Sequence, residues 1–137
     1  MNSKKLPTVA VYLRFYGDSF DPSEITKKLG VQPTNQFVPG DPITKDGEGS
    51  RRGYGWILKV GNQETLDVAP LLNELRDLVP VSGGTIKKLC EELGVEPVVI
   101  CGVGQPTGAD TPAVLFPAGF TEWVASFGGS ISVDIVL

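Results

Sequence analysis

The chain has 137 residues, about the length of one domain, and its 41% hydrophobic and 20% charged residues are typical of a globular protein. These values exclude a wholly disordered chain and a coiled coil. The net charge of −4 argues against a general nucleic-acid binder, because phosphate binding depends on an excess of Lys and Arg. The longest apolar runs, residues 98–101 and 113–116, are far shorter than the roughly 20 residues of a membrane span. We therefore expect one domain over 1–137 that binds neither membrane nor nucleic acid.

The N-terminus and the cysteines indicate the compartment. Arg14 follows the N-terminal lysines too soon for the apolar region of a secretory signal peptide, so we expect a cytoplasmic protein. Cys90 and Cys101 fall on a predicted helix and the next predicted strand, where two intracellular thiols are more often reduced core residues than a disulfide. The sequence has no His, the commonest metal ligand and the commonest activating base. We expect no cofactor, no metal site and no catalytic residue.

A strand and a capped helix come first in the chain. Residues 9–16 alternate strongly apolar and more polar side chains, a period of two that predicts a strand. In the following helix, Asp21 is the expected N-cap, Pro22 suits the first helical position, and Glu24 lies at the positive end of the helix dipole. Gly30, which can adopt a left-handed conformation, is expected to end this helix.

Proline and glycine recur over residues 32–54, which predicts an irregular segment too long for a passive connector. We expect it to be either mobile or a binding loop. Near its end, Arg51, Arg52 and Tyr54 combine positive charge with an aromatic ring, residue types that binding hot spots favour, and we predict a partner-binding site there. A solvated loop without a partner is the alternative. Trp56, in the next predicted strand, is expected to anchor one face beside a cleft that a ligand could occupy.

The second half of the chain alternates helices and strands. Helical spacing of leucines and aromatic residues predicts helices, and short β-branched or alternating runs predict strands. The expected elements are a strand over 55–60, helices over 67–78 and 82–93, a strand over 97–101, an irregular loop without ligand over 102–112, a helix over 116–127 and a strand over 130–137.

Four strands and four helices in this order predict an α+β domain. We expect a two-layer sandwich, with a mostly antiparallel four-stranded sheet and helices on one face, and a ferredoxin-like arrangement is the nearest named fold. Arg14, in an otherwise apolar strand, should lie on the exposed face or pair with a carboxylate such as Asp134. If residues 131–137 form an edge strand, a homodimer becomes plausible.

Several motifs carry a resemblance to a known family. They are Leu13-Arg14-Phe15, Gly17, Asp21-Pro22-Ser23-Glu24-Ile25-Thr26, Leu29-Gly30-Val31, Pro33-Thr34, Gly40-Asp41, Trp56 and Ser132-Val133-Asp134-Ile135. In this order they resemble the bacterial domain of unknown function 4279 family over nearly the whole chain, although residues 102–112 match no pattern of that family. The resemblance implies a small α+β bacterial protein with no established activity. Some members look like immunity proteins of toxin systems.

Three functions remain open from the sequence. The first is a non-catalytic protein-binding module, which as an immunity protein would block its partner by surface complementarity. The acidic net charge points to a basic partner or a toxin. The second is a small-ligand sensor that uses an uncovered sheet face or a cleft beside Trp56. The third is an enzyme without histidine that uses carboxylates, for which the sequence identifies no catalytic pair.

Overall fold

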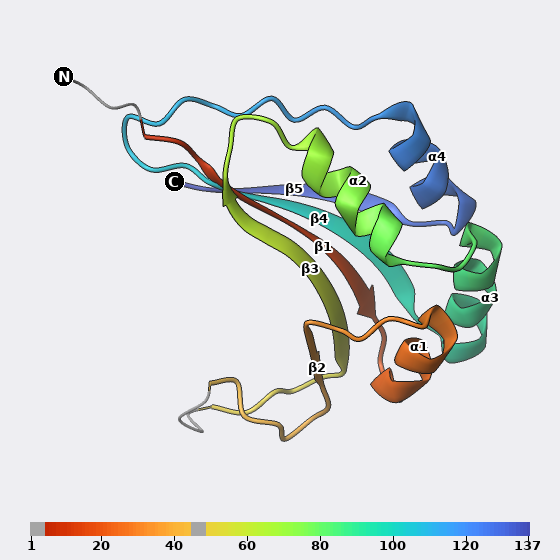
Figure 1. Ribbon diagram of the computed structural model, residues 1–137. Coiled ribbons are helices and arrows are strands. Elements are labelled where there is room, and N and C mark those ends of the chain that lie inside the picture. Colours follow the sequence, from red (N-terminus) through yellow and green to blue (C-terminus); the bar gives the residue numbers. More distant parts are fainter. Residues whose placement is uncertain (1–4, 45–48) are drawn as a thin grey trace.

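The computed structural model describes residues 5–44 and 49–137. They form a five-stranded mixed sheet with strand order β2-β3-β1-β4-β5 and four helices. The sheet and helices shape a two-layer α+β fold (Figure 1). The elements are β1 (Thr8–Tyr16), α1 (Pro22–Leu29), β2 (Asn35–Phe37), β3 (Gly55–Glu64), α2 (Ala69–Leu78), α3 (Gly83–Leu93), β4 (Glu96–Gly104), α4 (Ala118–Ser126) and β5 (Ser130–Val136).

The sheet differs from the expected four-stranded, mostly antiparallel one in two respects. The first is β2, a short fifth strand that pairs antiparallel with β3 inside the segment expected to be an irregular loop. The second is β5, which runs parallel to β4 because the chain crosses back through α4 before it enters the sheet. The element order also differs from the β-α-β-β-α-β order of a ferredoxin-like domain.

The two segments expected to be irregular are partly ordered. In the first, Pro42 and Ser50 form an isolated antiparallel bridge, and the Gly40 N–H donates to the Arg51 carbonyl at 2.9 Å. Residues 45–48 of this segment lie outside the described residues. The second segment is shorter than expected because β4 continues to Gly104. The Gln105 side-chain amide then donates to the carbonyl of Ala109 at 2.7 Å, which closes a turn.

All four helices lie on one face of the curved sheet (Figure 1). The apolar face of β1 lies beneath them, and Val9, Val11, Leu13 and Phe15 are completely buried there. Leu71, Leu72 and Leu75 of α2, Ile86 of α3 and Phe120 of α4 join the same core. On the other face of the sheet, no helix is formed by the residues that the structure describes (Figure 1), and we call it the open face.

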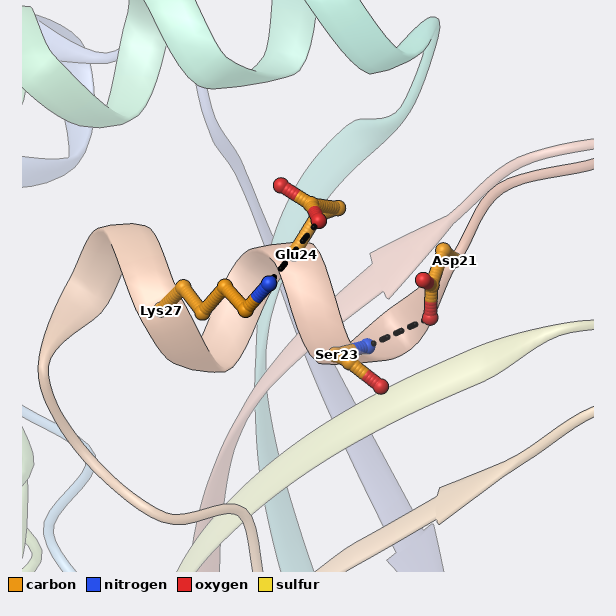
Figure 2. A network of polar contacts seen from close by, with 4 residues as sticks. All are labelled: Asp21, Ser23, Glu24 and Lys27. Carbon is orange, nitrogen blue, oxygen red and sulfur yellow. Dashed lines mark hydrogen bonds and ion pairs between the residues drawn. The ribbon is translucent and has the colours of Figure 1, made fainter.

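Helix α1 is capped at both ends. The Asp21 carboxylate accepts a hydrogen bond from the Ser23 backbone N–H at 3.0 Å, and Glu24 pairs with Lys27 one turn later at 3.5 Å (Figure 2). Pro22 occupies the first helical turn, where its missing N–H leaves no helical hydrogen bond unmade. Gly30 ends the helix with φ +70°, a conformation that glycine adopts without a steric penalty.

Both cysteines are buried and unbridged, Cys90 on α3 and Cys101 on β4. Burial raises the pKa of the Cys90 thiol to about 11, with a further contribution from the nearby Glu91 carboxylate. Burial also raises the pKa of Cys101. Within residues 5–44 and 49–137, no helix has the length and apolar character to cross a membrane.

Candidate functional site

The open face of the sheet brings charged and aromatic side chains together. On β1, Tyr12 and Arg14 point away from the helices and are half-buried, whereas their neighbours Leu13 and Phe15 are completely buried on the helix side. Pairing between strands continues this pattern, because Tyr12 lies opposite Lys59 of β3 and Arg14 lies opposite Ile57. The Lys59 Nζ lies 5.6 Å from the centre of the Tyr12 ring, a cation–π contact.

Phe37 of β2 is the aromatic centre of one end of this face. It pairs with Gly55 of β3, and its ring lies directly on the Gly55 backbone, where an added Cβ would overlap the ring. This close approach requires a residue without a side chain at position 55. Phe37 is 7% exposed although it belongs to a three-residue edge strand, because arginine side chains cover it.

Two arginines that are far apart in the sequence meet at this ring. The Arg51 guanidinium carbon lies 4.1 Å from the centre of the Phe37 ring, and that of Arg14 lies 5.9 Å from the same point. The Arg14 guanidinium also stacks on Tyr16 at 4.4 Å. We call Arg14, Tyr16, Phe37 and Arg51 the Arg–aromatic cluster.

The guanidinium groups of the cluster have unused hydrogen-bonding capacity. The Nε atoms of Arg14 and Arg51 are shielded from solvent and have no hydrogen-bond partner among the described residues. Within that part of the chain, neither arginine forms an ion pair. A guanidinium has five N–H donors in a planar fork that matches a carboxylate. The cluster is therefore chemically suited to an anionic group that approaches the open face.

A shallow pocket of about 340 Å³ adjoins the cluster. Asn35, Gln36 and Arg51 line it together with Asp41 and Ile43 from the adjoining loop. The Asp41 carboxylate accepts a hydrogen bond from the Val38 backbone N–H at 2.9 Å, so it stabilises the local turn. The pocket therefore adds amide, apolar and carboxylate groups beside the cationic cluster.

A second hollow of about 390 Å³ lies further along the open face. Small residues make it possible, since Ala10 and Gly102 face each other on neighbouring strands. Tyr12, Ile100, Asn62 and Asp134 also line it. The open face thus has a cationic aromatic end and a hollowed end.

Comparison with protein-family models matches residues 7–137 to a domain of unknown function, DUF4279. The match covers essentially the whole chain. The chain belongs to the DUF4279 family. No curated protein and no solved structure matches this domain.

The DUF4279 domain separates the three residues that the sequence grouped as a binding site. Arg51 stacks on Phe37 at the open face, while the adjacent Arg52 is exposed and points to solvent. Tyr54 instead packs beside the core, with its ring centre 5.8 Å from that of Phe20. Of the three, the structure brings Arg51 into a cluster of functional groups.

Trp56 lies in the core of the domain. Its side chain is completely buried, packs edge-on against Phe15 at 5.4 Å, and donates its Nε1–H to Thr26 Oγ1 at 3.0 Å. Because no part of the side chain reaches the surface, the structure assigns it to packing rather than to a cleft. The hydrogen bond ties α1 to β3. Asp21, Pro22 and Glu24 have the structural role expected of them at the start of α1.

From the sequence, Arg14 was expected either to lie on the exposed face of the sheet or to pair with a carboxylate such as Asp134. The register excludes that pair, because Arg14 lies opposite Val98 whereas Asp134 pairs with Gly102, four residues along β4. Tyr16 and Phe37 were missed entirely. Tyr16 could have been placed on the same face of the strand as Arg14, because the two residues are two positions apart. For Phe37 the sequence shows only a lone aromatic residue in a proline-rich segment.

Proposed function

We propose that this DUF4279 domain is a non-catalytic protein-binding module that binds an acidic segment of its partner on the open face. The observation that supports the proposal is the Arg–aromatic cluster, in which Arg14 and Arg51 converge on Phe37 and neither arginine forms an ion pair among the described residues. Arginine and aromatic residues dominate the energetics of protein interfaces. Stacking also holds the two guanidinium groups in place before binding, which lowers the entropy lost on association.

The local charge of the cluster selects the partner chemistry. The chain as a whole carries a net charge of −4, which favours a basic partner, but Arg14, Arg51 and Lys59 concentrate positive charge on the open face. Short-range complementarity at the contact outweighs the net charge, because salt screens charges separated by more than about 8 Å at physiological ionic strength. We therefore revise the expected partner from a basic protein to one with acidic side chains at its contact surface.

Adjacent arginines offer a matched test. We expect a fluorescein-labelled hexaglutamate peptide to bind the native domain in an anisotropy titration, and Arg51→Glu to weaken binding at least tenfold. Arg52→Glu makes the same charge change one residue away, at an exposed side chain that stacks on no ring of the described residues, and should weaken binding no more than about threefold. Equal losses in the two variants would show a diffuse electrostatic effect and contradict the proposal. Tighter binding of an oligothymidine of equal charge would point to nucleic acid instead.

An immunity protein is the narrower form of this proposal. The partner would then be a toxin that presents carboxylates to the cluster, and no catalytic group would be needed in this chain. Co-expression tests it: the native domain should protect cells from a toxin of its own host, and Arg51→Glu should abolish protection while Arg52→Glu retains it. If the Arg51→Glu variant still protects the cells, protection does not depend on the Arg–aromatic cluster.

A small-ligand sensor is the second candidate, supported by the 390 Å³ hollow over Ala10 and Gly102. A side chain added at Gly102 would project from the sheet into this hollow, with its Cβ 3.5 Å from the Tyr12 ring. A ligand of the hollow should raise the melting temperature of the native domain and leave that of Gly102→Leu unchanged. A shift of equal size in both proteins would place the ligand elsewhere.

A further inference from the structure

The edge strand β5 leaves a row of apolar side chains uncovered. Ile131 is 36% exposed, Val133 42% and Ile135 60%, although these residues face the helix side of the sheet beside the buried Val99, Cys101 and Val103 of β4. The helix layer does not extend over them. An edge strand with exposed apolar residues is a ready template for pairing with another strand.

Among residues 5–44 and 49–137, no strand pairs with the outer side of β5. The Val136 carbonyl accepts from the Gln105 N–H at 2.8 Å, so the backbone groups of Val136 and of alternate residues before it point toward β4. The N–H and C=O groups of Ile131, Val133 and Ile135 consequently point outward. The three exposed apolar residues on the helix side of β5 are therefore also those whose backbone groups point away from β4.

We propose that a second copy of this chain pairs antiparallel with β5 about a two-fold axis at Val133. Val133 then lies opposite Val133 of the partner subunit, and Ile131 lies opposite Ile135 of the partner subunit. All three outward residues become hydrogen-bonded pairs, and each apolar side chain meets another apolar side chain. The result is a continuous ten-stranded sheet with both open faces on one side.

The charges of β5 are compatible with this register. Asp134 lies on the open face, where Ser132 Oγ donates to its carboxylate at 3.1 Å within the chain. Antiparallel pairing about Val133 places Asp134 opposite Ser132 of the partner subunit, a hydroxyl donor. Moving the axis by one residue to Asp134 would bring two carboxylates face to face, which is destabilising. The strand is thus complementary to itself about Val133.

An apolar hollow of about 230 Å³ next to β5 supports the same arrangement. Val103, Val114, Pro112 and Ile135 line it on the helix side. Because Ile131 of the partner subunit lies opposite Ile135, its side chain reaches the rim of this hollow. The proposal is independent of the function proposed for the Arg–aromatic cluster, which lies toward the opposite edge of the sheet.

The test measures mass in solution by light scattering after gel filtration, at about 100 μM protein. We expect the native chain to elute at twice 14.6 kDa and Val133→Lys, which places two cations opposite each other, to elute as a monomer with an unchanged circular dichroism spectrum. Leu78→Lys on α2 is the matched control, since Leu78 is also 42% exposed, and it should remain dimeric. A monomeric native protein, or a dimeric Val133→Lys variant, would overturn the proposal.

Cysteine cross-linking tests the register without disturbing the fold. Val133→Cys should form a disulfide-linked dimer on mild oxidation, because the residue faces itself across the axis. Ile131→Cys alone should not, whereas Ile131→Cys combined with Ile135→Cys should. Cross-linking of Ile131→Cys as efficiently as Val133→Cys would refute pairing about Val133. The native chain is the control, because its two cysteines are buried and should not form a disulfide between subunits.

Discussion

At the scale of single residues, the candidate site depends on one glycine. The Phe37 ring lies on the Gly55 backbone. The Arg51 guanidinium carbon lies 4.1 Å from the centre of this ring. A side chain at position 55 would displace the ring and with it the surface on which the arginines stack. The missing Cβ of Gly55 is therefore as much a part of the cluster as the charged groups are.

Gly55→Ala tests this dependence. We expect the free energy of unfolding to fall by about 1–3 kcal/mol, because the added methyl group overpacks the site, and hexaglutamate binding to weaken without any change in charge. Gly53→Ala is the control, since a Cβ there meets no atom of the described residues within 4 Å, and its effect should stay within about 0.5 kcal/mol. Urea unfolding and anisotropy measure the two effects. Full binding by Gly55→Ala would show that ring position does not matter.

At the scale of elements, α1 shows how local sequence specifies the ends of a helix while tertiary contacts dock it on the sheet. Asp21, Pro22 and Gly30 define its ends through backbone hydrogen bonds and allowed dihedral angles. Its docking against the core involves Ile25 and Leu29, which are completely buried, and the Trp56 indole N–H, which donates to Thr26. The helix start is thus a local property, and its docking is not.

Asp21→Ala should lower the free energy of unfolding by about 1 kcal/mol, because the backbone N–H of Ser23 loses its carboxylate acceptor (Figure 2). Ser23→Ala is the control, as the serine contributes its backbone to this contact and its side chain is exposed. Its effect should stay below about 0.5 kcal/mol. Chemical denaturation of the three proteins in parallel provides the comparison. Equal stability of both variants would show that the Asp21 carboxylate does not stabilise α1.

At the scale of the whole molecule, burial of the thiols links stability to pH. The pKa of Cys90 is raised from 9.0 to about 11, so the folded state keeps this proton at a pH where the unfolded chain has lost it. The stabilising effect is complete below pH 9.0 and is lost as the pH rises toward 11. Cys101 acts in the same direction, since burial raises its pKa too.

We therefore expect the free energy of unfolding to fall with rising pH above 9.0, with Cys90 contributing up to about 1.4 kcal/mol per pH unit. Cys90→Ala removes that titration, so its stability should depend less steeply on pH between 9 and 11, even though the variant is less stable at pH 7. Urea titrations at several pH values yield both slopes. Identical slopes would show that the thiol titrates equally in both states.

The sequence predicted the elements that depend on local periodicity and capping. Alternation in β1, the Asp-Pro cap of α1, and the apolar spacing of α2 and α3 each involve residues within a few positions of one another. For the same reason the family motif was recognisable, and the match over residues 7–137 confirms that resemblance. The α+β class and the single layer of helices followed from the order of these elements.

Strand pairing and the contacts between distant segments depend on the tertiary structure and could not be predicted from local sequence patterns. Three residues of β2 are too few to show a period, and they form a strand because β3 offers them an edge. The parallel direction of β5 depends on the crossover through α4. Arg14, Phe37 and Arg51 meet only because β1, β2 and a loop converge on one sheet face. The sequence by itself determined the elements, their caps and their buried faces, whereas strand pairing between distant segments determined the candidate site.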